Sequence, residues 1–185
     1  MASELKVQTL KGPTSGANAN KVIIPSGQTL DMSAGTLTPS SGQIIQTVTS
    51  TSTASVNTTS SGWQDTSLAV SITPTKTSSK ILICYNGMIN AYNASDFWAD
   101  HTLFKDQATN LFNNGVGSRT AAGGAYAAGG ADFHVPATAI FEDTPNSTSA
   151  IDYRVFVRRG TGSSGNARWN IDNWTCVITA MEIAG

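Results

Sequence analysis

Charged residues are scarce in this chain. They make up 12% of its 185 residues, about half the share usual in globular proteins. The 11 Lys and Arg residues nearly balance the 12 Asp and Glu residues, so the formal net charge is −1. This balance excludes a general electrostatic attraction to nucleic acid or to anionic membranes. Because 39% of the residues are hydrophobic, it also excludes charge-driven disorder.

Cysteines are few, only two in the chain, and long hydrophobic runs are absent. Cys84 and Cys176 both lie in apolar strand patterns, so we expect buried, reduced thiols, with a disulfide between neighbouring strands as the alternative. The spacing of Cys and His matches no zinc site, and we expect no metal and no cofactor. No apolar run is long enough to span a membrane. The first residues lack the apolar stretch of a signal peptide.

A short unit recurs near the N-terminus. Residues 24–30 read Ile-Pro-Ser-Gly-Gln-Thr-Leu and residues 38–45 read Thr-Pro-Ser-Ser-Gly-Gln-Ile-Ile. Pro and Gly interrupt these residues too often for a helix. One copy is too short to bury a core, so residues 21–48 predict a thin, β-rich stalk in which identical chains wrap around one axis. The alternative is a linker that contains two similar turns.

The remainder, residues 49–185, has the pattern of an all-β head domain. Leu68, Val70 and Ile72 alternate with small and polar residues, as in a half-buried strand. A turn is expected at 160–165 and a long Gly- and Ala-rich loop at 113–131. Strands are expected at 67–73, 81–85, 97–105, 111–112, 133–141, 151–158 and 174–183. Short strands separated by turn signals predict an antiparallel β-sandwich, jelly-roll-like in arrangement.

Two strands carry further expectations. The strand 81–85 is apolar on both faces, so it is central or meets a second copy of the chain. Pro136 cannot donate a hydrogen bond to a neighbour, so it favours an edge strand or a bulge. In the last strand we expect Trp174, Cys176 and Ile178 to share one face.

Three segments carry a family resemblance. They are Ser-Glu-Leu-Lys-Val at 3–7 with Ile-Ile-Pro-Ser-Gly-Gln-Thr-Leu-Asp at 23–31, Ser-Ile-Thr-Pro-Thr-Lys-Thr-Ser-Ser-Lys-Ile-Leu-Ile at 71–83, and Ile-Thr-Ala-Met-Glu-Ile at 178–183. On these segments the chain resembles short tail-fibre or fibre-like structural proteins of tailed bacteriophages, of the marine-phage type. The resemblance implies a homotrimer on the virion surface, attached to other virion proteins through residues 1–20, with the head pointing outward. A capsid decoration, or a fibre on the tail tube without receptor binding, is the alternative.

Enzymatic chemistry is not expected. Cleavage of glycans requires two carboxylates at a defined separation. The candidate pairs, Asp96 with Asp100, Glu142 with Asp143, and Asp152 with Asp172, lie in no catalytic motif. Asp100 beside His101 could assist proton transfer or bind a metal, but a single His on a strand is more typical of a structural role.

Binding of a host surface glycan or receptor has more candidates. Carbohydrate sites place an aromatic face beside amides and carboxylates. Such groups recur around Tyr92, Asp96 and Trp98, and again around Trp169 and Asp172, while Tyr126 is the aromatic residue of the 113–131 loop. The other interpretation is that the tryptophans belong to the core and the Asn and Asp residues to turns. A stand-alone carbohydrate-binding module is therefore the functional alternative from a different class.

Overall fold

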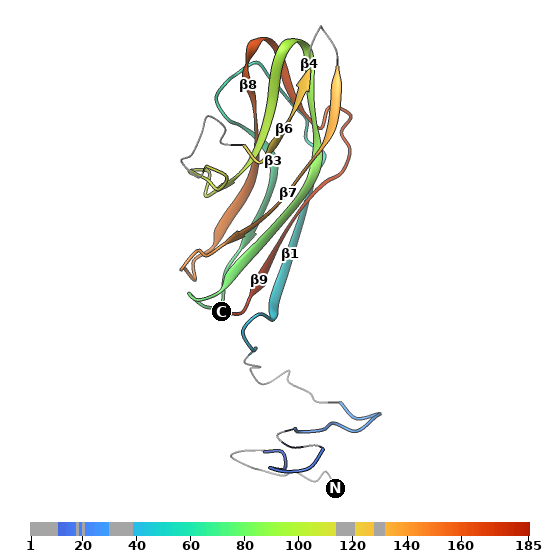
Figure 1. The fold of residues 1–185 in the computed structure, drawn as a ribbon, viewed down its shortest axis with the longest axis vertical. Coiled ribbons are helices and arrows are strands. Elements are labelled where there is room, and N and C mark those ends of the chain that lie inside the picture. The colour runs from blue at the N-terminus through green and yellow to red at the C-terminus, as the bar shows by residue number, and fades with distance from the viewer. Residues whose placement is uncertain (1–10, 18, 20, 30–38, 114–120, 128–131) are drawn as a thin grey trace. The chain divides into compact units, whose positions relative to one another are not determined.

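The computed structural model describes residues 11–17, 19, 21–29, 39–113, 121–127 and 132–185, with the backbone alone for 93–97 and 161–164 (Figure 1). The chain divides into two compact units, Met1–Thr38 and Pro39–Gly185. The described part of the second unit is built from strands. They are β1 (Ile44–Ser52), β2 (Val56–Thr58), β3 (Gln64–Ile72), β4 (Lys80–Lys105), β5 (Thr109–Asn110), β6 (Gly123–Ala127), β7 (Phe133–Asp143), β8 (Ile151–Trp169) and β9 (Cys176–Ile183).

The two turns expected near the N-terminus are present. The Gln28 amide donates to the Pro25 carbonyl and the Gln43 amide to the Ser40 carbonyl, each at 3.1 Å. Gly27 and Gly42 hold the third position of these turns with φ of 80° and 86°, a conformation that favours glycine. The residues between the turns, 30–38, and most of the proposed attachment peptide, 1–10 with 18 and 20, lie outside the described residues.

Two long strands, β4 and β8, run through both layers of a β-sandwich, and Figure 1 shows them curving together at one end of it. The first part of β4 pairs with β9 on one side and β7 on the other, and β1 lies beyond β9. We call these strands layer A. The last part of β4 pairs with β8, β5 and β6, and β3 lies beyond β8. We call these strands layer B.

Alternate side chains from the two layers fill the space between them. β3 packs against β1 and β9 without pairing with either, which brings layer B face to face with layer A. The largest fully buried side chains are Trp169, Tyr153, Leu68, Ile81, Ile83, Ile89, Leu103, Ile178, Glu182, Val155 and Val157. The predicted all-β class, antiparallel pairing and sandwich are confirmed, as is the alternation expected for Leu68, Val70 and Ile72 in β3.

Several predicted boundaries are corrected by the pairing. Residues 44–48, assigned above to the stalk, form the first part of β1 and pair with β9, which gives them hydrogen-bond partners that the sequence alone does not reveal. The strand expected at 81–85 and the one expected at 97–105 are a single strand, β4. Its hairpin partner is β5 rather than 111–112, because Asp106 and Gln107 turn the chain with φ of 50° and 57°.

Two segments expected to be loops or turns are strands. β6 lies within the 113–131 segment and pairs with residues 97–101 of β4, although Gly and Ala are depleted in strands generally. β8 continues through the turn expected at 160–165 as it bends from one layer to the other. Pro136 lies in β7, which pairs with β4 alone among the described strands, so the edge position predicted for it is confirmed.

Gly87 lies where the indole ring of Trp169 crosses β4. A Cβ atom at position 87 would lie 2.3 Å and 2.5 Å from Cζ2 and Cη2 of Trp169, and 3.2 Å from Sγ of Cys176. Trp169 is fully buried, so its ring has no open space into which it can move. The ring therefore packs directly on the β4 backbone, and only glycine allows this approach.

We expect Gly87→Ala to lower the free energy of unfolding by about 1–3 kcal/mol, because the added methyl group overpacks the core. Urea unfolding followed by tryptophan fluorescence measures this loss. Gly62→Ala is the matched control, since the nearest atom to its added Cβ is Oγ of Ser60 at 3.4 Å. Equal unfolding midpoints for the two variants would contradict the packing described here.

Glu182 is a buried carboxylate that joins three segments of the chain. Its Oε1 accepts hydrogen bonds from the Ser79 hydroxyl at 2.6 Å, and from the hydroxyl and amide of Thr75 at 2.8 Å and 2.7 Å. Its Oε2 accepts from Nε2 of Gln46 at 2.6 Å. Burial by itself raises the pKa of Glu182, but these donors outweigh it and hold the pKa below the usual value. The carboxylate thus fastens β1 and the β3–β4 turn to β9.

A lowered pKa means that Glu182 stabilises the fold above the ordinary carboxyl pKa of about 4.3, and that this contribution is lost as the pH falls through the folded-state pKa. We expect Glu182→Gln to lower the free energy of unfolding by about 1–3 kcal/mol at neutral pH. The glutamine amide replaces one accepting oxygen with an NH2 group, which cannot accept a hydrogen bond from the donors around it. The cost should shrink at about pH 3. Urea unfolding at the two pH values tests this, with the exposed Glu142→Gln as control. A pH-independent cost would refute the assignment.

Candidate functional site

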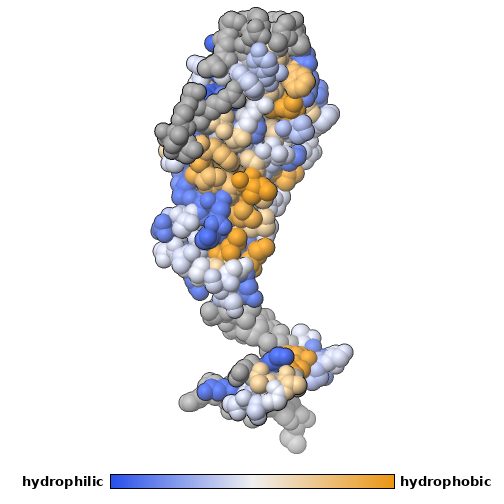
Figure 2. All heavy atoms as spheres, viewed as in Figure 1, coloured by the Kyte–Doolittle hydropathy of each residue, from blue (hydrophilic) through white to orange (hydrophobic). Residues whose placement is uncertain are grey.

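The outer face of layer A is nearly uncharged. Across β7, β4 and β9, the outward positions of 138–142, 80–84 and 177–183 are Thr138, Ile140, Glu142, Lys80, Leu82, Cys84, Val177, Thr179, Met181 and Ile183. The two charges among them neutralise each other, since Nζ of Lys80 lies 2.7 Å from Oε1 of Glu142. Ile140 remains 70% exposed. Hydrophobic residues gather over the middle and lower part of the sandwich in Figure 2.

The outer face of layer B differs sharply. Arg154 bridges Asp65 at 2.6 Å and Asp152 at 3.0 Å, and the hydrogen bond to Asp65 is the main cause that raises the pKa of this arginine. Arg158 contacts Asp100 at 3.3 Å and lies 4.3 Å from the ring centre of Trp63. Paired charges of this kind suit a face that water covers. The two faces therefore have different chemistry, and the apolar one is on layer A.

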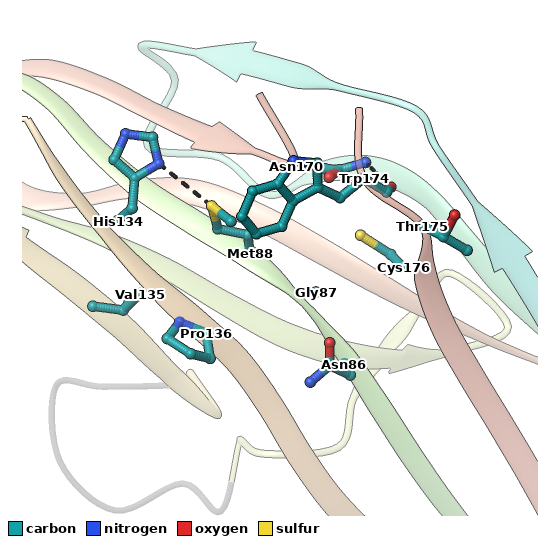
Figure 3. Close-up of a pocket in the computed structure, with 10 residues that line it drawn as sticks. All are labelled: Asn86, Gly87, Met88, His134, Val135, Pro136, Asn170, Trp174, Thr175 and Cys176. Carbon is teal, nitrogen blue, oxygen red and sulfur yellow. Dashed lines mark hydrogen bonds between the residues drawn. The ribbon is translucent and has the colours of Figure 1, made fainter. Parts of the chain in front are cut away.

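A pocket lies where β4 changes its partner. Asn86 is the last residue of β4 paired with β9, and Ile89 is the first paired with the end of β8. Between them the 170–175 segment leaves the sheet, held by the Asn170 amide, which donates to the Met88 carbonyl at 2.9 Å. The resulting pocket has a volume of about 360 Å³ (Figure 3). It is lined by Asn86, Gly87, Met88, His134, Val135, Pro136, Asn170, Trp174, Thr175 and Cys176.

Trp174 is presented to this pocket by a tight turn. Asn170 and Asn173 have φ of 49° and 55°, a left-handed conformation that asparagine tolerates. The Asn173 amide donates to the Asn170 carbonyl at 3.0 Å, and Nδ2 of Asn170 donates to the Trp174 carbonyl at 2.8 Å. Trp174 nevertheless remains 59% exposed. In Figure 3 it lies over Met88, on the same side as His134. The expectation that Trp174 shares the inner face of the last strand is wrong, because β9 begins at Cys176.

The structure brings some of the predicted contact residues together. Trp98 and Tyr126 face each other across β4 and β6 with ring centres 4.7 Å apart. Tyr92 is covered by the guanidinium of Arg168, whose Cζ lies 3.3 Å from the ring centre. These residues therefore form one aromatic pair and one cation–π pair.

The other predicted contact residues are not gathered into one site. Trp169 is fully buried in the core, where no ligand reaches it from the surface, so the core interpretation is correct for this residue. Asp172 is exposed in the turn before Trp174. The side chain of Asp96 lies outside the described residues. Sequence reasoning did not single out the exposed Trp174, although Asn170 and Asn173 were a signal of the turn that exposes it.

Two of the candidate pairs that the structure describes, Asp100 with His101 and Glu142 with Asp143, have side chains that point in different directions. Asp100 points to the outer face of layer B, toward Arg158. His101 points into the core, where its Nδ1 lies 2.7 Å from the Tyr85 hydroxyl. Burial lowers the pKa of His101 to about 4, so the ring is neutral at physiological pH. Glu142 and Asp143 diverge in the same way, one toward Lys80 and the other toward Lys105.

Within the described ranges, no group of His, Cys, Asp and Glu residues is arranged to hold a metal ion. Cys84 and Cys176 are free thiols, the latter buried with a raised pKa because of that burial. No helix in the described part of the chain has the length and apolarity needed to cross a membrane.

Comparison with known proteins finds similar solved structures but no matching family model. No family model matches the chain, and no curated protein sequence matches it. A solved structure of infectious bursal disease virus, Gx strain, contains a chain with 15% identity and a TM-score of 0.41, over 88% of this chain and 38% of that one. A mutant VP2 protein of the same virus, in T=1 particles, has 14% identity and a TM-score of 0.37, over 93% and 44%. This chain thus spans less than half the length of either, and no family membership follows.

Proposed function

We propose that this protein is a structural component of a virion, a short fibre-like appendage that assembles as a homotrimer with its β-sandwich as the head. The observation that carries the proposal is the uncharged outer face of layer A. The sequence resemblance to phage fibre proteins supplies the virion setting and the number of copies. Attachment through residues 1–20, and contact of the head with a host surface, belong to the same proposal.

The energetics of the layer A face favour a partner. Antiparallel sheets that face water normally alternate between apolar inward and polar outward residues. Here Leu82, Met181 and Ile183 point outward in addition to Ile140. Complete burial of one such aliphatic side chain contributes about 1.5–3 kcal/mol. A protein that covers this face would therefore be bound by several residues together.

A second copy of the chain fits this face better than a charged partner does. The face has no net charge, because Lys80 and Glu142 pair with each other, so two copies meet there without repulsion. The N-terminal unit has an unburied apolar segment of its own, Val22 to Ile24, in which each side chain is exposed. Identical chains aligned in parallel could cover both apolar surfaces at once, whereas a partner for the head alone leaves Val22 to Ile24 in water.

Ile140→Lys tests the assembly face. We expect the wild-type chain to be a trimer at micromolar concentration and the variant to be a monomer, because like charges brought together in one interface cost on the order of several kcal/mol. Mass photometry or analytical ultracentrifugation measures the change. Ser71→Lys adds the same charge to an exposed position of β3 and should remain trimeric. A monomeric wild type, or an Ile140→Lys trimer, would overturn the proposed face.

Deletion of residues 1–20 tests the proposed attachment. This segment has few apolar groups and contains Gly12-Pro13, so we expect it to gain order only against a partner. The truncated protein should form soluble, folded trimers that are no longer incorporated into particles, as measured by quantifying the protein in purified virions. Normal incorporation would mean that the stalk or head makes the attachment and that the orientation is reversed.

A further inference from the structure

The pocket beside Trp174 has the exposed apolar surface and the volume that a ligand site requires. Trp174 is 59% exposed on a turn fixed by Asn170, which leaves apolar surface in water. Exposed apolar surface beside polar groups is typical of binding sites. The pocket volume, about 360 Å³, lies near the small end of the range for ligand pockets. A ligand of one or two rings would fill it.

The lining limits the chemistry of that ligand. Met88, Val135 and Pro136 provide an apolar lining, while Asn86, His134 and Thr175 provide amide, imidazole and hydroxyl groups. None of the described lining residues is Lys, Arg, Asp or Glu, and Nε2 of His134 lies 3.3 Å from Oδ1 of Asp132. The site therefore offers hydrogen bonds and an aromatic face but no net charge. Anionic ligands gain nothing there.

We propose that this pocket binds a neutral pyranose sugar of a surface glycan, with the apolar face of the sugar ring against Trp174. The hydroxyl groups of the sugar then meet the side chains of Asn86 and Thr175. This proposal deepens the suggested contact with a host surface and shares that premise. It differs in its residues from the sequence-based candidates, since the rings of Trp98 and Tyr126 already cover each other.

The pocket adjoins the proposed assembly face at Asn86, which pairs with Thr138 and Val177, and it extends away from that face toward Met88. Along β4, Cys84 and Met88 are four residues apart, which corresponds to about 13 Å. A trimer built on the 80–84, 138–142 and 177–183 positions can thus leave the pocket open. If a second copy fills the pocket instead, Trp174 becomes an assembly residue, and the experiment below distinguishes the two cases.

The test uses the full chain and a panel of neutral monosaccharides, including glucose, galactose and N-acetylglucosamine. Ligand-observed NMR at about 10 mM sugar detects binding with a Kd near millimolar. We expect at least one sugar to bind, and we expect Trp174→Ala and Asn86→Ala each to weaken it about tenfold or more. Trp174→Phe, which keeps an aromatic face, should restore most of the affinity. Tyr126→Ala, an exposed aromatic on β6, should have no effect.

Three results would overturn the sugar site. One is that no neutral sugar binds to the folded wild type. Another is that Trp174→Ala binds as well as the wild type while Tyr126→Ala does not, which moves the site to β6. The third is that Trp174→Ala dissociates the oligomer, which makes the pocket an interface. Because oligomeric state and virion incorporation are measured separately on the wild-type chain, failure of the sugar site is distinguishable from failure of the structural role.

Discussion

The pairing of β4 with both β8 and β9 is the constraint on which the rest of the structure depends. Because β4 belongs to layer A at its beginning and to layer B at its end, the two layers are held in one continuous hydrogen-bonded sheet. The inward residues of this strand, such as Ile83 and Leu103, are fully buried on opposite sides of the same core. Loss of register in β4 would turn the apolar side chains of both layers outward at once.

The pocket is a consequence of the same pairing. A strand that changes partner must leave a short gap in its ladder, and here the gap falls at Gly87 and Met88. The close approach of Trp169 to Gly87 fills the gap from the inside. On the outside, the gap is bordered by the 170–175 turn, which carries Trp174. A buried tryptophan and an exposed one, five residues apart, thus lie on the two sides of one irregularity in the sheet.

The sequence was most informative where a strand is half-buried and least where a strand is long, bent or built from small residues. Leu68, Val70 and Ile72 follow the period of two that such a strand requires, and the structure confirms them. β6 was missed because its Gly and Ala residues have low strand propensity and are held by pairing with β4. Trp174 was misplaced because it is an even number of residues from Cys176 and Ile178, as residues on one face of a strand are. This alternation does not reveal where a strand begins, and β9 begins at Cys176.

The distribution of charge decides which outer face is available for which task. On layer B, Arg154 and Arg158 are engaged by carboxylates of their own face, so covering them with another copy would require desolvating several ions. On layer A, the only ion pair among the outward positions of 80–84, 138–142 and 177–183 is Lys80 with Glu142. Association through layer A therefore leaves the ionic network in water. It also uses the end of the sheet where Glu182 fastens β1, and β1 is the strand that follows the N-terminal extension.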